Sequence, residues 1–177
     1  MREDTAENPQ RRPTDEPTVS ADAPLRLEQF LPYRLNVVAS LVSQALSRIY
    51  ADRYQIGVPE WRVLVTLGQF GVMTGKAVGA HSHMHKTKVS RAVALLERRK
   101  LVARRANHED MREAFLSLTP AGRAIYQEIA PIALTFAERF TDGIDPADRA
   151  AFDRVLGKLT ERAQALVAET QNGDKQP

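Results

Sequence analysis

The sequence has no cysteine and no long apolar run. Without cysteine it can hold no disulfide, no cysteine-ligated zinc and no thiol-based redox sensor. No apolar stretch approaches the ~18 residues that span a bilayer, and no signal-peptide pattern is present, so we expect a cytoplasmic protein. Nucleophile elbows, phosphate-binding loops, Gly-rich dinucleotide turns and zinc-hydrolase signatures are also missing. We therefore expect no enzyme and no cofactor.

Charge is unevenly distributed along the 177 residues, whose formal net charge is +3. Residues 1–26 combine recurrent prolines with charged and small residues, and acidic residues outnumber arginines there. This composition predicts a disordered tail. The more basic remainder fits an anionic partner. We expect a single domain over residues 27–170 and a frayed end over residues 171–177.

Helical spacing of apolar residues predicts long helices at both ends of this domain, over about 31–54 and 120–169. Thr119-Pro120 and Asp145-Pro146 have the chemistry of helix starts, a capping side chain followed by proline. A shorter helix is predicted to begin at Pro59. The first and last helices carry apolar stripes that nothing nearby in the sequence covers, which favours a homodimer joined by these helices.

The segment between them, about 59–118, predicts a fold with mainly α-helices and a small β-wing, a winged helix-turn-helix. Thr74 is a candidate N-cap of one short helix. A second short helix from Lys86 has Val89, Val93 and Leu96 on one face. Its other face presents basic and hydroxyl side chains, which suit the major groove of DNA.

Two β-compatible runs, 101–105 and 114–118, flank the polar turn 107–110. Arg112 lies just past the turn, where it can enter a narrow minor groove. The alternative is a basic helix and hairpin on a solvated surface. The predicted contacts with double-stranded DNA are Thr74, His85, Lys86, Thr87, Lys88, Ser90, Arg91, Arg98 and Arg112.

The segments KTKVSRAVALLERRKLVARR and EDMREAFLSLTPAGR resemble the MarR family of bacterial transcription regulators. The second segment is the more specific, because the family's wing carries Asp-x-Arg followed by Leu-Thr-x-x-Gly. Here these are Asp110, Arg112, Leu118, Thr119 and Gly122. One departure is Lys100, where the family usually has glycine.

The resemblance implies a two-fold dimer with intertwined terminal helices, bound to a pseudo-palindromic operator. It also implies a small aromatic or phenolic acid, or its thioester, as effector, since the chain looks like the subgroup that controls aromatic-acid catabolism. We expect a repressor of a catabolic or efflux operon that such an effector releases. An aromatic wall with a fixed cation suits this ligand, and the candidates are Tyr33, Arg34, Trp61, Arg62 and Phe70.

Each candidate has a plainer interpretation. Trp61 and Phe70 can be core residues, and Arg34 and Arg62 can form surface ion pairs. The alternating His81, His83 and His85 raise the alternative of a metal-responsive regulator, although no carboxylate lies between them to complete a ligand set, and no metal site is predicted. A helical adaptor that does not bind DNA is the second alternative.

Overall fold

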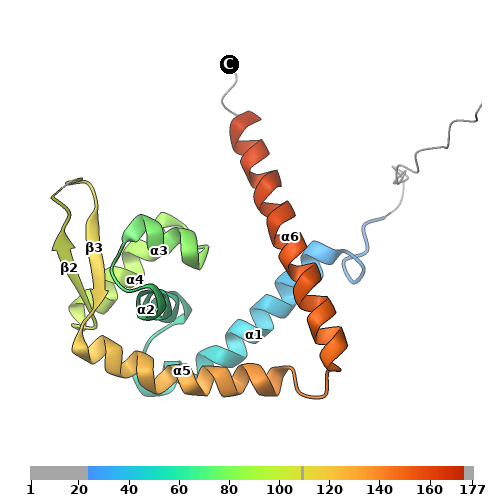
Figure 1. The fold of residues 1–177 in the computed structure, drawn as a ribbon, viewed down its shortest axis with the longest axis horizontal. Coiled ribbons are helices and arrows are strands. Elements are labelled where there is room, and N and C mark those ends of the chain that lie inside the picture. Colours follow the sequence, from blue (N-terminus) through green and yellow to red (C-terminus); the bar gives the residue numbers. More distant parts are fainter. Residues whose placement is uncertain (1–23, 109, 174–177) are drawn as a thin grey trace, which may run out of the picture. The chain divides into compact units, whose positions relative to one another are not determined.

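The computed structural model describes residues 24–108 and 110–173. Their order along the chain is α1 (Leu31–Tyr54), α2 (Val58–Phe70), β1 (Met73–Thr74), α3 (Gly75–Ser82), α4 (Lys86–Arg98), β2 (Val102–Ala106), β3 (Ala114–Leu118), α5 (Pro120–Phe140) and α6 (Pro146–Gly173) (Figure 1). The predicted winged helix-turn-helix with long terminal helices is confirmed. Among the described residues, no helix has the length and apolar character needed to cross a membrane. The predicted tail lies mostly outside the described residues.

Two compact units meet inside α1, between Ser40 and Leu41. The described part of the first unit is a turn followed by the first ten residues of α1, and its large apolar side chains are exposed except for the half-buried Val37. The second unit contains the rest of α1 and all the other elements. The buried hydrophobic core lies entirely in this second unit.

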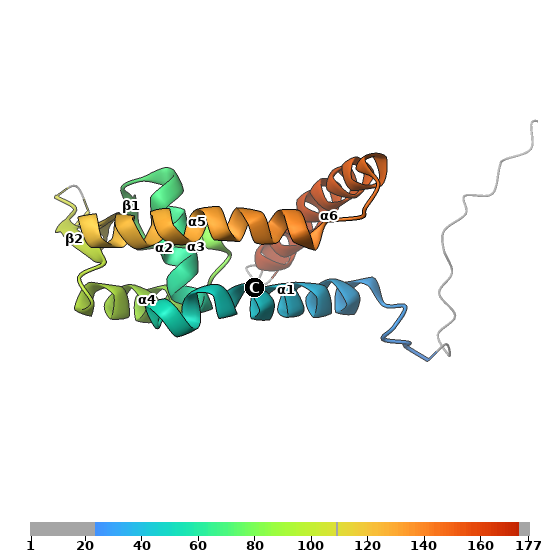
Figure 2. The same ribbon diagram turned by 90° about the horizontal axis from the view of Figure 1, so that it is seen from below.

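The core of the second unit is built around α2, whose Val63, Leu64 and Leu67 are fully buried. Helices α3, α4 and α5 pack against α2, and Figure 2 shows α5 starting beside the wing and passing α2. Helix α4 contributes Val89, Val93 and Leu96 to this core. The buried face predicted from their spacing is therefore confirmed.

The sheet is antiparallel with the order β1-β3-β2. Strand β2 begins at Val102, one residue later than predicted, because Leu101 belongs to the end of α4. The Leu101 N–H bonds the Leu96 carbonyl at 2.9 Å, and the Lys100 N–H bonds the Glu97 carbonyl at 2.9 Å. These two bonds form a Schellman motif. Lys100 has φ 60°, the left-handed conformation for which the family's glycine is suited.

Strand β1 has only two residues, and the sequence did not predict it. Met73 pairs with Leu116 and Thr74 with Phe115. This short strand ties the start of α3 to the wing. Thr74 then caps α3 as predicted, because its Oγ1 accepts the Ala77 N–H at 3.2 Å.

Helix α5 begins at a tight junction with the wing. The Thr119 Oγ1 accepts the Gly122 N–H at 3.0 Å, which confirms the predicted cap. The same hydroxyl donates to the Lys100 carbonyl at 2.7 Å. A Cβ on Gly122 would lie 2.0 Å from the Leu101 carbonyl oxygen, so no other residue fits there without movement.

Helix α6 has no buried residue over 146–170, the part whose side chains are described. Its apolar residues nevertheless follow helical spacing, and the exposed large ones are Phe152, Val155, Leu156, Leu166 and Val167. A 28-residue helix with such a stripe is not stabilised by this chain's own core.

Candidate nucleic-acid interface

Helix α4 separates its residues sharply between core and solvent. The exposed residues are Lys86, Thr87, Lys88, Ser90 and Arg91. The buried ones are Val89, Ala92, Val93 and Leu96. Because the buried face fixes the helix, the opposite face offers cationic and hydroxyl donors in a rigid arrangement. Such donors bond phosphates and the acceptor atoms of bases in the major groove.

The turn before α4 is held by its own backbone and side chains. His83 ends α3 in the left-handed conformation, with φ 51°. Met84 is buried and anchors the turn. The His85 Nδ1 accepts the Thr87 N–H at 3.3 Å and so caps α4. His85 is exposed at the start of this helix, next to the cationic face.

The wing tip explains the Asp-x-Arg pattern in physical terms. The Asp110 Oδ1 accepts the Arg112 N–H at 2.9 Å, and the Asp110 carbonyl accepts the Glu113 N–H at 3.0 Å. Asp110 thus closes the turn that contains Arg112. The Arg112 side chain is exposed. An arginine held at an exposed hairpin tip suits a minor groove.

A bidentate ion pair joins the wing to α4. The Nε and Nη2 atoms of Arg104 donate to the two carboxylate oxygens of Glu97, both at 2.9 Å. The hydrogen bond to Glu97 raises the pKa of Arg104 above its ordinary value. The wing therefore keeps a defined position beside the exposed face of α4.

A hollow of about 620 Å³ lies among α3, α4 and the wing. Lys76, Lys86, Arg104 and Arg112 line it, together with His85 and Ser90. It brings four of the predicted DNA contacts together: His85, Lys86, Ser90 and Arg112. The other four predicted contacts on α4 are exposed but are not among the lining residues: Thr87, Lys88, Arg91 and Arg98. Thr74 is half-buried as the cap of α3.

Sequence reasoning missed Lys76, which is exposed in the first turn of α3 and lines the same hollow. Its nearness to Thr74 was a signal, because the start of the first short helix lies close to the second in any helix-turn-helix.

The three alternating histidines have separate local environments. The His81 ring lies 4.3 Å from the Phe70 ring, centroid to centroid, while His83 ends one helix and His85 begins the next. Within the described ranges, no three potential metal-binding side chains of the His, Cys, Asp or Glu type gather at one place.

The predicted effector residues fall into different environments. Trp61 is only 6% exposed and stacks on Tyr50, with ring centroids 5.5 Å apart, so in this conformation its ring belongs to the core. Arg62 and Phe70 are exposed on α2. Tyr33 and Arg34 are exposed on the part of α1 that belongs to the first unit.

Comparison with known proteins agrees with this geometry. Residues 56–114 match the sequence model of the MarR family. No curated protein sequence matches the chain significantly. A MarR-family regulator from Silicibacter pomeroyi is 27% identical, with a TM-score of 0.65, and the match covers 76% of this chain and 90% of that one.

Two further structures share the fold. A MarR/EmrR-family regulator from Acinetobacter sp. ADP1 has a TM-score of 0.73 at 21% identity, over 80% of this chain and 99% of that one. BpsR of Bordetella bronchiseptica, whose DNA binding is regulated by 6-hydroxynicotinic acid, has a TM-score of 0.69 at 23% identity. That match covers 78% of this chain and 98% of BpsR. With residues 56–114 matching this family's sequence model, its winged helix and its cationic face, the chain is similar to the MarR family of transcription regulators.

Proposed function

We propose that this regulator is a homodimeric repressor that binds a pseudo-palindromic operator and is released by a small aromatic acid. The observation that carries the DNA-binding part is the exposed face of α4 beside the wing arginine. We assign base contacts to α4, with Arg91 near its centre, and a minor-groove contact to Arg112. The protein then acts in the cytoplasm, where its operator is.

The dimer is supported by α6, whose apolar stripe has no buried residue over 146–170. A second apolar surface is a groove of about 450 Å³ lined by Leu41, Val42, Ala45, Phe136, Arg139 and Phe140. Apolar surfaces of this extent usually mark association sites. Two-fold association would present two copies of α4 to successive major grooves, about 10 bp apart.

The test of base reading compares two variants on the duplex that the wild-type protein selects. Arg91→Ala should cost about 1–3 kcal/mol of binding free energy and relax preference at one position of each half-site. Arg112→Ala should mainly weaken binding to sites with a narrow minor groove. Arg154→Ala, on the side of α6 opposite its apolar stripe, is the matched control and should bind like wild type. Wild-type binding by both Arg91→Ala and Arg112→Ala would show that the reading surface is misassigned.

An aromatic acid is the proposed effector class, in keeping with the regulation of BpsR by 6-hydroxynicotinic acid. The effector would shift the population of conformations, so its effect is limited by its differential affinity for the two states. We propose Arg34 as the cation for the carboxylate, with Tyr33, Arg62 and Phe70 as further contacts. Trp61 would join them only if its stacking on Tyr50 were broken.

The effector test titrates a panel of aromatic acids and their thioesters into the operator complex. A compound that releases wild type but not an Arg34→Ala variant that still binds DNA would support the assignment. An unchanged response of Arg34→Ala would remove that residue from the site.

A further inference from the structure

Arg99, the residue that ends the recognition helix, forms a long-range contact that base reading does not explain. Its Nη2 donates to the Tyr54 carbonyl at 2.7 Å, and its Nη1 donates to the Gln55 carbonyl at 2.8 Å. The neighbouring Arg98 is exposed, whereas Arg99 is half-buried. One guanidinium thus joins the C-terminal end of α4 to the last turn of α1.

The end of α1 is shaped for this contact. The last carbonyls of a helix have no partner within it, and a cation near them is favoured by the helix dipole. Gln55 adopts φ 50°, a conformation that is uncommon outside glycine. This turn places two successive carbonyls within reach of the planar guanidinium group of Arg99. A lysine ammonium, which is a point charge without that fork, cannot reproduce the arrangement.

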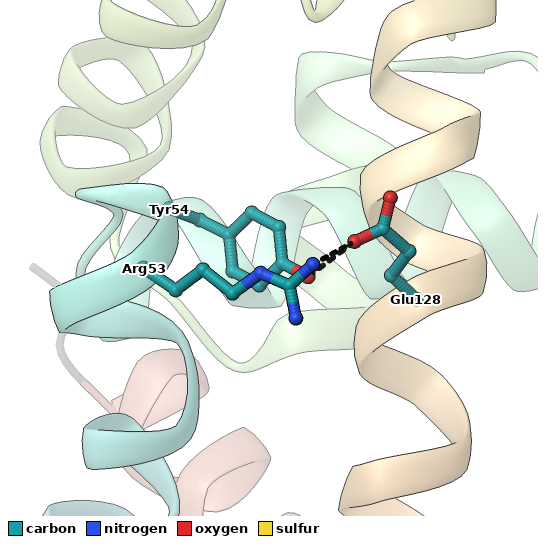
Figure 3. Close-up of polar contacts among 3 residues, drawn as sticks. All are labelled: Arg53, Tyr54 and Glu128. Carbon is teal, nitrogen blue, oxygen red and sulfur yellow. Dashed lines mark hydrogen bonds and ion pairs between the residues drawn. The ribbon is translucent and has the colours of Figure 1, made fainter.

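The same turn is attached to α5 on its other side. The Tyr54 hydroxyl donates to the Glu128 Oε2 at 2.6 Å, and the Arg53 Nη2 donates to the same oxygen at 3.1 Å (Figure 3). The Arg53 guanidinium also lies over the Tyr54 ring, 5.2 Å from its centroid. Tyr54 itself is 9% exposed, so its ring is fixed in the core.

We propose that Arg99 is a positioning residue for DNA recognition, because residues 53–55 form one joint that holds the recognition helix on one side and α5 on the other. The joint sets the orientation of α4 toward the major groove. Arg99 itself does not contact DNA. A movement of α1 or α5 would reach α4 through this joint. The inference rests on the proposed function, in which α4 reads bases.

The experiment measures affinity for the selected operator and for random duplex at several salt concentrations, at a temperature where each variant is folded by circular dichroism. Arg99→Lys keeps the charge but loses the fork. It should weaken operator binding about tenfold, since a small misplacement of a recognition element is costly. Random-duplex affinity should change less than about twofold, because the charge that governs non-specific binding is retained.

A second pair of variants separates positioning from phosphate binding. Arg99→Gln should weaken operator binding as Arg99→Lys does and leave the salt slope unchanged. Arg98→Gln, the matched neighbour in the predicted interface, should weaken binding to both duplexes and reduce the slope by about 1. If Arg99→Gln lowered the salt slope of operator binding by about 1, Arg99 would be a phosphate contact and the proposed positioning role would be wrong. Operator affinity of Arg99→Lys within twofold of wild type would leave Arg99 a purely structural role.

Coupling across the joint provides the last test. Tyr54→Phe removes only the hydroxyl that bonds Glu128, and it should also weaken operator binding. Because both side chains hold the same turn, the double variant Tyr54→Phe/Arg99→Lys should lose less than the product of the two single losses. A double variant whose loss of operator affinity equals the product of the two single losses would contradict the joint. If the wild-type protein itself showed no preference for the operator, the proposed function would be refuted. The wild-type protein alone is enough for this test.

Discussion

At the scale of single residues, Lys100 occupies a backbone conformation that favours glycine. It holds the left-handed position of the Schellman motif, where a Cβ is strained. Lys100→Gly should therefore raise the free energy of unfolding by about 0.5–1 kcal/mol, since relief of strain exceeds the extra freedom of glycine in the unfolded chain. Urea denaturation measures this difference. Lys100→Ala keeps the Cβ and should give no gain; an equal gain from alanine would assign the cost to the lysine side chain instead.

Gly122 is the opposite case, a residue that its surroundings require. A Cβ there would lie 2.0 Å from the Leu101 carbonyl oxygen. This oxygen belongs to the backbone, which cannot move away as easily as the end of a flexible side chain. Gly122→Ala should lower the free energy of unfolding by about 1–3 kcal/mol, as overpacking does. Gly75→Ala, at the first position of α3 with nothing within 4 Å of the new Cβ, is the matched control. Equal stabilities of the two variants would disprove the clash.

At the scale of elements, the contact between α1 and α5 predicts a pH dependence. The hydrogen bond to Glu128, with burial, raises the pKa of Tyr54 above its ordinary value of 10.0. A raised folded-state pKa means that the contribution to stability is present below about pH 10 and is lost as pH rises further. The stability difference between wild type and Tyr54→Phe should thus be constant from about pH 7 to 9 and shrink above about pH 10. Denaturant titrations across this range measure it, and a difference that grows at high pH would contradict the assignment.

The sequence predicted the helices well, because their buried faces and capping residues are local signals. Val89, Val93 and Leu96 define the face of α4 by spacing alone. The two-residue β1 is too short to leave a pattern, and β2 starts late because Leu101 completes the end of α4. The partners of Arg99 were beyond prediction, since they are backbone carbonyls 44 and 45 residues away that any sequence possesses.

At the scale of the whole molecule, α6 predicts association. Leu166→Glu places a charge in the apolar stripe and should weaken dimerisation about tenfold or more, given the free energy of burying a leucine. Ala168→Glu adds the same charge on the other side of the helix and should leave the dimer intact. Analytical ultracentrifugation over a concentration series distinguishes them. Unchanged association of Leu166→Glu would place the dimer interface elsewhere.

The central claim is that this chain reads DNA sequence with α4 and the wing. Selection of bound sequences from a random duplex pool by the wild-type protein tests it most directly. Our account predicts an enriched motif with two inverted half-sites whose centres lie about 10 bp apart. Recovery of no preferred sequence, with binding that salt alone controls, would contradict it.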